Sequence, residues 1–326
     1  MRKLLLKLFG FLLLLWVLFA VAVYAFPKYM YNDEYGLYAN TKIKTAEPHE
    51  VLILGDSRAQ AGILADAFQS DVYSLALPGG TAVEGYYVLD EYLKNNPAPQ
   101  AIIISYAPYH FELGETFWER AVKMDFLSLA QSWEVVNESI RLDDDIALRG
   151  GGLDGGVAQY GKLLLYKLKY PPYYMADVSS LLSQGAKNAE RYDWVTEEVQ
   201  DGEGQFYFGR ADSTSATNSE AARSNFEESH LIYDYFDRIL TRCEEEGITV
   251  YVFTAPMSQI SCQAMSDAFV SGYQEKMAAV WTAHPEAMID AAFNELPNDY
   301  FGDESHVNPK GAEWFTDYIK KATGIE

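Results

Sequence analysis

The 326-residue sequence is poor in cysteine and in basic residues. Its two cysteines, Cys243 and Cys262, flank a predicted strand, and they either pair outside the cytoplasm or remain free thiols. Neither has a metal-ligand spacing, and the acidic run Asp143–Asp145 offers too few ligands for calcium, so we expect no metal and no cofactor. The formal net charge of −22 repels phosphate backbones, which argues against nucleic acid as a partner.

The long uncharged run of the sequence lies at its N-terminus. Arg2, Lys3 and Lys7 precede nineteen uncharged residues, Leu8–Phe26, and roughly 20 apolar residues span a bilayer. Basic residues before the run favour a cytoplasmic N-terminus with the rest of the chain extracytoplasmic. Cleavage after Ala20-Val21-Ala22 would instead make it a removable signal peptide, but the run continues past that site. We expect a single-pass cell-membrane protein with a signal-anchor helix over residues 1–26 and a stalk over 27–48.

Short apolar runs alternate with helical patterns in the remaining chain. Strands are predicted over residues 50–54, 72–77, 101–107, 248–253 and 287–292. This alternation is typical of βαβ units and predicts an α/β domain, residues 49–326, with a parallel sheet. It stops between about residues 110 and 225, where helical patches and glycine breaks at Gly150–Gly152 and Gly155-Gly156 predict a mostly helical insertion over the carboxyl edge of the sheet.

Two short motifs carry candidate catalytic chemistry. Ser57 follows the first predicted strand in Gly55-Asp56-Ser57, and a serine hydroxyl needs a neighbouring base to become a nucleophile. His306 is the candidate base, because among five histidines it alone lies in a polar loop beside an acid, Asp303, at short spacing. Taken separately, Ser57 is more often a turn serine and Asp303 a cap. Together they favour a Ser-His-Asp triad.

Gly55-Asp56-Ser57 after an apolar strand, with Asp303-Glu304-Ser305-His306 near the C-terminus, resembles the SGNH/GDSL hydrolase superfamily. The resemblance covers roughly residues 48–110 and 226–326 and not the insertion. It implies a three-layer, flavodoxin-like parallel sheet, with Ser57 as nucleophile, His306 as base and Asp303 as its orienter. It further implies oxyanion donors at the N–H of Ser57 or Arg58 and at Gly79 or Gly80.

The sequence departs from the family pattern after the third strand. The family usually carries Gly-x-Asn-Asp there, whereas this chain has Tyr106-Ala107-Pro108-Tyr109-His110 and no asparagine. Losing one oxyanion donor costs roughly two to three orders of magnitude in rate. Tyr109 and His110 are placed to substitute, although a histidine here is more often a packed or exposed loop residue.

The anchor, the insertion and the missing asparagine resemble the transferase branch of the superfamily. That branch includes D-alanine-transfer proteins of teichoic acid and polysaccharide O-acetylation proteins that work beside a membrane-bound O-acyltransferase. The resemblance implies a bacterial cell-envelope enzyme that carries an acyl group on Ser57 and transfers it to a surface polysaccharide or teichoic-acid-like polymer. Asp56, where alanine-transfer proteins more often carry serine, favours O-acetylation. The alternatives are an exported esterase with the same triad and an inactive SGNH-like polysaccharide-binding or scaffold module.

Two further features allow two interpretations each. Arg58 either pairs with an anionic substrate group or forms a salt bridge to one of many carboxylates. The segment Lys162–Tyr174, with three lysines and four tyrosines, either contacts anionic lipid headgroups or a polymer, or is a helical lid that packs its leucines on the core.

Overall fold

The computed structural model describes residues 1–114, 116–144, 146–149 and 155–326. The expected glycine break at Gly150–Gly152 and the last residue of the acidic run, Asp145, lie outside the described residues. The helices are α1 (Arg2–Ala25), α2 (Pro27–Met30), α3 (Glu34–Thr45), α4 (Ser57–Gly62), α5 (Ala82–Asn95), α6 (Leu129–Arg141), α7 (Val157–Lys167), α8 (Met175–Asp201), α9 (His230–Glu246), α10 (Gln259–Ala264), α11 (Asp267–Ala283) and α12 (Pro309–Thr323). The strands are β1 (Val51–Gly55), β2 (Val72–Ser74), β3 (Ala101–Ser105), β4 (Thr249–Phe253), β5 (Met257–Ser258), β6 (Met288–Asp290) and β7 (Glu295–Leu296).

A parallel sheet of five strands organises the domain. Its order is β2-β1-β3-β4-β6, and every neighbouring pair is parallel. The predicted α/β class and parallel sheet are confirmed. The strands themselves are shorter than predicted: β2 ends at Ser74 rather than Leu77, and β3 at Ser105 rather than Ala107. Two-stranded pairing of β5 with β7 was not predicted.

The sheet is buried on both faces, which explains the continuous apolar runs of its central strands. Leu52, Leu54, Ile102 and Ile104 belong to one core cluster, together with residues of α5 and α9. The intervening side chains of β1 and β3 belong to a second cluster, together with residues of α12. Burying each large aliphatic side chain contributes about 1.5–3 kcal/mol, so both faces stabilise the three-layer arrangement.

The order of the strands locates the reactive edge of the sheet. From β1 the chain moves outward to β2, and from β3 it moves the other way to β4. If the five strands of this sheet are numbered along the chain, so that β6 is the fifth, their order is 2-1-3-4-5, as in doubly wound sheets. In such sheets, ligands bind at the carboxyl ends of the two strands between which the winding of the chain reverses direction. Those strands are β1 and β3, so the residues that follow Gly55 and Ser105 meet at this point.

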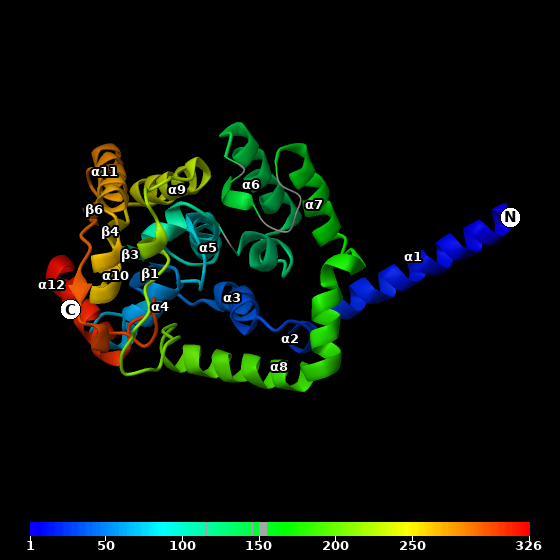
Figure 1. The fold of residues 1–326 in the computed structure, drawn as a ribbon, viewed down its shortest axis with the longest axis horizontal. Coiled ribbons are helices and arrows are strands. Elements are labelled where there is room, and N and C mark those ends of the chain that lie inside the picture. Colours follow the sequence, from blue (N-terminus) through cyan, green and yellow to red (C-terminus); the bar gives the residue numbers. More distant parts are fainter. Residues whose placement is uncertain (115, 145, 150–154) are drawn as a thin grey trace.

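The described part of the insertion is helical and contains no strand, as predicted. Its longest element, α8, bends at Gln184, which has non-helical dihedral angles. Figure 1 shows α8 running along one edge of the molecule beside α3 and α2. The insertion therefore wraps around the domain.

The segment 27–48, expected as a stalk, instead folds onto α8 as the helices α2 and α3. Met30, Tyr31, Leu37 and Tyr38 are buried there, because their apolar side chains recur at helical spacing and pack against the insertion. The prediction of a stalk was wrong.

The predicted N-terminal apolar helix is confirmed as α1. Among the described residues it is the one helix long and apolar enough to cross a membrane, and its N-terminal part projects away from the domain (Figure 1).

The two cysteines are free thiols. Cys243 is fully buried in α9, and burial raises its pKa to about 12. Burial also raises the pKa of Cys262 to about 11, so both thiols are protonated at neutral pH.

Candidate active site

Ser57 lies where the ends of β1 and β3 approach closely. A Cβ at Gly55 would lie 2.1 Å from the carbonyl oxygen of Ser105, so this position requires glycine. Asp56 then caps α4, because its carboxylate accepts a hydrogen bond from the Arg58 N–H at 2.8 Å. Ser57 is therefore the first residue of α4, at the carboxyl edge of the sheet.

Ser57, His306 and Asp303 form one chain of hydrogen bonds. Nε2 of His306 lies 2.8 Å from Oγ of Ser57, and Nδ1 lies 2.8 and 3.0 Å from the two carboxylate oxygens of Asp303. All three residues are partly exposed, so a substrate can approach from solvent. With Asp303 ionised, Nδ1 carries the ring proton and Nε2 accepts the hydrogen bond from the serine hydroxyl. This geometry permits His306 to take the proton of Ser57 while Asp303 stabilises the imidazolium.

The loop that carries His306 keeps Asp303 ionised. Oδ1 of Asp303 accepts hydrogen bonds from the N–H groups of Ser305 and His306, at 2.8 and 2.7 Å. Partial burial opposes ionisation. The hydrogen bond and charge of His306, with the two N–H groups, outweigh burial and lower the pKa of Asp303 below 3.8. The loop is closed by the Gly302 N–H, which donates to the His306 carbonyl at 2.9 Å.

Asp56, beside the serine, forms a second pair with a histidine. Its carboxylate is fully buried and lies 2.6 Å from Nδ1 of His110, and it also accepts the N–H of Ala107 at 2.7 Å. Burial opposes ionisation here too. The charge and hydrogen bond of His110, then Arg58 and the Ala107 N–H, outweigh burial and lower the pKa of Asp56 to about 2. Asp56 thus links the ends of β1 and β3 and orients His110 within the predicted site.

Arg58 forms a salt bridge within the protein, one of the two interpretations given above. Its Nη2 lies 2.7 Å from Oε2 of Glu220, and both side chains are buried. Glu220 begins a short 3₁₀ turn in the insertion, and its other oxygen accepts the N–H of Tyr109 at 3.4 Å. Tyr109 itself is buried, with the guanidinium of Arg223 4.7 Å from the centre of its ring. The insertion therefore holds both sides of the sheet edge around Ser57.

Two of the predicted oxyanion donors are already hydrogen-bonded. The Arg58 N–H donates to Asp56, and the Gly80 N–H donates to the Leu77 carbonyl at 2.9 Å. Within the described residues, the N–H groups of Ser57 and Gly79 make no hydrogen bond. Gly79 adopts a positive φ of 64°, and its carbonyl accepts a hydrogen bond from Thr116 at 2.6 Å. No hydrogen bond in the described part of the chain joins the Gly79-Gly80 turn to Ser57.

Comparisons with models of protein families, with curated proteins and with solved structures found no match. The resemblance to SGNH hydrolases stays a prediction from the sequence.

A strap from the insertion, residues 204–211, crosses the site. The Phe206 N–H donates to the Gln60 carbonyl at 3.1 Å, and the Ala211 N–H donates to the Gly302 carbonyl at 3.2 Å. The ring of Phe208 lies 4.9 Å from the imidazole of His306, at an angle of 32°. The strap thereby shields one face of the histidine from water.

The strap and the His306 loop meet through two glycines. A Cβ on Gly209 would lie 2.4 Å from the carbonyl carbon of Gly302, so the two backbones can touch only because neither residue has a side chain. Beside them lies an open cavity of 590 Å³ lined by Tyr207, Arg210, Asp212, Asp299 and Lys310, among others. Its charged and hydrogen-bonding lining suits a ligand rich in hydroxyl groups.

Sequence reasoning missed three residues of this site. Asp56 was treated only as part of a motif, although its position before Ser57 could have suggested a cap. Glu220 and Phe208 come from the insertion, where no periodicity or motif indicated a role. Two aromatic residues near the site in the sequence, Trp118 and Tyr106, are buried in the core.

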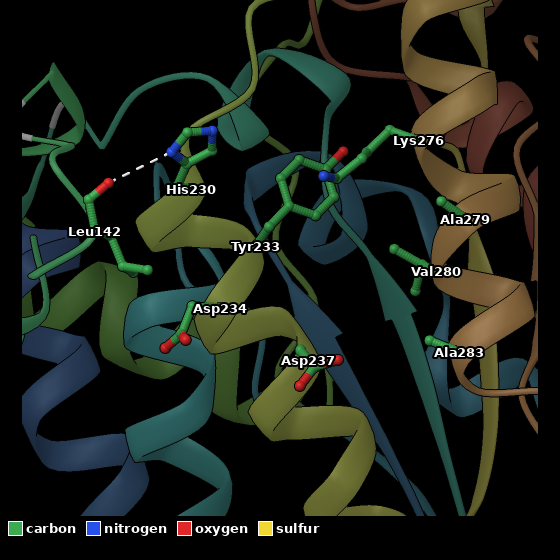
Figure 2. A pocket seen from close by; sticks show the side chains of 9 residues that line it. All are labelled: Leu142, His230, Tyr233, Asp234, Asp237, Lys276, Ala279, Val280 and Ala283. Atoms are coloured by element: carbon green, nitrogen blue, oxygen red, sulfur yellow. Dashed lines mark hydrogen bonds between the residues drawn. The ribbon is translucent and has the colours of Figure 1, made fainter.

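A second cavity, of 380 Å³, lies between α9 and α11 (Figure 2). His230 lies at its rim with Nδ1 3.5 Å from the Leu142 carbonyl, and Lys276 lies over the ring of Tyr233. None of its lining residues belongs to the site at Ser57. Over the described ranges, no cluster of three His, Cys, Asp or Glu residues is arranged to hold a metal ion.

Proposed function

We propose that the chain is a membrane-anchored, extracytoplasmic O-acyltransferase of the SGNH type, which transfers an acyl group, preferably acetyl, to a bacterial cell-surface glycan. The observation that carries the proposal is the hydrogen-bonded chain from Ser57 through His306 to Asp303. Support also comes from the position of Ser57 at the reversal point of the sheet and from the apolar helix α1.

The geometry supports a two-step reaction. Ser57 Oγ attacks the carbonyl carbon of the acyl donor while its proton passes to Nε2 of His306. The tetrahedral intermediate collapses, the leaving group takes the proton from His306, and an acyl-Ser57 ester remains. In the second step His306 removes the proton of an acceptor hydroxyl, whose oxygen attacks the ester; the bond to Ser57 Oγ breaks, and His306 returns the proton to that oxygen. Asp303 stabilises the imidazolium in both steps.

The developing oxyanion needs donors aimed at it, and the free N–H of Ser57 is the first. We assign the role of the missing asparagine to His110. With Asp56 ionised, Nδ1 of His110 holds a proton, so Nε2 donates when the ring is an imidazolium. Within the described residues, Nε2 of His110 makes no hydrogen bond, so it is available to a substrate.

The donor and the acceptor follow from the same proposal. A membrane-bound O-acyltransferase would deliver the acyl group at the outer face of the membrane, next to α1. A polysaccharide or teichoic-acid-like polymer would supply the hydroxyl, and the cavity beside the strap is the proposed place for it. The Phe208 ring limits the access of water, which favours transfer over hydrolysis.

The test uses the full chain in detergent with p-nitrophenyl acetate, with and without a polysaccharide acceptor. We expect an acetyl group on the peptide that contains Ser57, detected by mass spectrometry, and acetylated polysaccharide. The Ser57→Ala variant should lose both. Ser305→Ala is the matched control, because it alters a serine of the catalytic loop but keeps the backbone N–H that bonds Asp303.

Three outcomes separate the alternatives. Serine-dependent release of acetate into water, with none on the polysaccharide, identifies an esterase. Equal release by wild type and Ser57→Ala, even when an acylated membrane partner is supplied, identifies a module that binds polysaccharide without catalysis. Acetylation at another residue refutes the assignment of Ser57.

A further inference from the structure

The end of α7 and the first half of α8 form a corner against α1. Trp16 of α1 donates a hydrogen bond to the carbonyl of Leu168 at 2.8 Å and lies 3.1 Å from that of Lys169. Its ring also packs against Tyr170, and Phe19 packs edge-on against Tyr174. Figure 1 shows α1 meeting the domain between these two helices. The C-terminal half of α1, which contains Trp16 and Phe19, therefore packs alongside the corner.

The length of α1 places this contact at the depth of the bilayer. Only eight uncharged residues, Leu8–Leu15, lie between Lys7 and Trp16, and they span about 12 Å of helix. The hydrocarbon core is about 30 Å thick, so those eight residues cannot cross it. If α1 spans the membrane, the part from Trp16 to its end at Ala25 must also lie in lipid. The corner packed against that part then lies at the same depth.

The surface of the corner is free of charge, which is unusual in so acidic a chain. The thirty residues 157–186 contain four charged side chains, Lys162, Lys167, Lys169 and Asp177, and each is at most 9% exposed. The lysines therefore do not form the basic surface considered from the sequence.

Each of these charges has a partner within the chain, although Asp125 is 32% exposed. Lys167 and Lys169 pair with Asp125, Asp177 pairs with Lys123 at 2.8 Å, and Lys162 lies 4.1 Å from the centre of the Trp118 ring. Internal pairing of this kind is what a surface in lipid requires.

Large apolar side chains take the exposed positions instead. Leu164 lies on α7 and Leu168 directly follows its last residue, and Met175 and Leu182 lie two turns apart on α8, with exposures between 41% and 81%. A soluble surface seldom gathers such residues without a partner.

We propose that this corner, Leu164–Leu182, inserts into the outer leaflet of the lipid bilayer beside α1. The proposal rests on the membrane-spanning role of α1 given above. Lipid is the occupant of this surface, because α1 sets the depth of the corner in the bilayer and packs directly against it. The domain is then held by two contacts, the helix and the corner, so its orientation on the membrane is fixed.

The experiment places an environment-sensitive nitrobenzoxadiazole label on single cysteines of the full chain, reconstituted in phosphatidylcholine–phosphatidylglycerol vesicles without other proteins. The background carries Cys262→Ser, and the buried Cys243, whose pKa is about 12, does not react. The labelled variants are Leu168→Cys and Leu182→Cys. Trp281→Cys on α11 is the matched control, because it is a large exposed apolar residue outside the corner.

We expect nitroxide groups on the lipid acyl chains to quench the labels at positions 168 and 182, with loss of their emission, and to leave position 281 unchanged. A water-soluble quencher should give the opposite result. Labels at 168 and 182 that behave like 281 would overturn the proposal and indicate a protein partner for this face.

A label on Leu12→Cys separates this result from the proposed function. If position 12 is quenched by the lipids and positions 168 and 182 are not, α1 spans the membrane and only the insertion of the corner is wrong. If position 12 is not quenched, the anchor itself is refuted.

Discussion

Replacing Asp56 by asparagine tests the role of this carboxylate. The carboxylate accepts three short hydrogen bonds, from the N–H groups of Arg58 and Ala107 and from His110. An asparagine has a single acceptor oxygen, so its NH₂ group must face at least one of these donors. An unsatisfied buried donor costs about 1–3 kcal/mol.

The linkage between proton binding and folding gives a similar magnitude for the loss of stability. The pKa of Asp56 is about 2 in the folded protein and 3.8 in its usual state, which corresponds to roughly 2.5 kcal/mol of stability. Because the folded-state pKa is lowered, this contribution is fully present above the unfolded value and is lost as the pH falls from 3.8 towards 2. We therefore expect Asp56→Asn to lower the free energy of unfolding by roughly 2–3 kcal/mol, and by the same amount between about pH 5 and pH 8.

The assay is urea unfolding of the full chain in mild detergent, followed by tryptophan fluorescence. Asp66→Asn is the matched control, because Asp66 is exposed, and it should change stability by less than about 0.5 kcal/mol. A loss below about 1 kcal/mol for Asp56→Asn would refute the reasoning, since it would mean that the buried donors find other partners. A loss that changes between pH 5 and pH 8 would contradict the lowered pKa, because the folded and the usual pKa of Asp56 both lie below that range.

Three further predictions concern other contacts. Glu220→Gln should destabilise the protein by about 3–5 kcal/mol in urea unfolding, because it leaves the charge of Arg58 buried without its partner. Phe208→Ala should raise the ratio of hydrolysed to transferred acetyl in the polysaccharide assay, because it exposes His306 to water. Thiol titration of the urea-denatured protein should find both Cys243 and Cys262 free with or without prior reduction, because neither is paired in the fold.

Each of these three predictions has a control variant or a result that would contradict it. Glu286→Gln removes an exposed charge and should leave stability unchanged; an equal loss in both variants would contradict the buried pair. Phe293→Ala removes a partly buried ring outside the site, and the ratio should not respond to it. For the cysteines, a band that migrates faster on a denaturing gel without reductant, and that is absent in Cys262→Ser, would show a disulfide.

Local chemistry made the core of the fold and the candidate triad predictable. The Thr81–Glu84 capping box begins α5, and Gly247, with a φ of 69°, ends α9; both are residue types typical of helix ends. The triad was predictable because each half is a short motif, and parallel strands bring their carboxyl ends to one edge of the sheet.

Features that depend on which surface packs against which were not predictable. The tyrosine-rich segment before β1 resembles a stalk in composition, but α8 provides a surface for Tyr31 and Tyr38. Nothing in the sequence indicates whether Lys167 of α7 faces solvent or Asp125. Glu220 reaches Arg58 only because the whole insertion folds back over the sheet.

The hydrogen bond between Ser57 and His306 joins residues 249 positions apart in the chain. During synthesis the serine is therefore made long before the imidazole of His306, and the contact forms only when the loop at residues 302–306 has emerged and folded. Contacts of such long range slow folding, because a large loop must close before they are gained. A nascent or truncated chain that ends before residue 302 contains Ser57 without His306. The reaction proposed here therefore cannot occur until the chain is nearly complete.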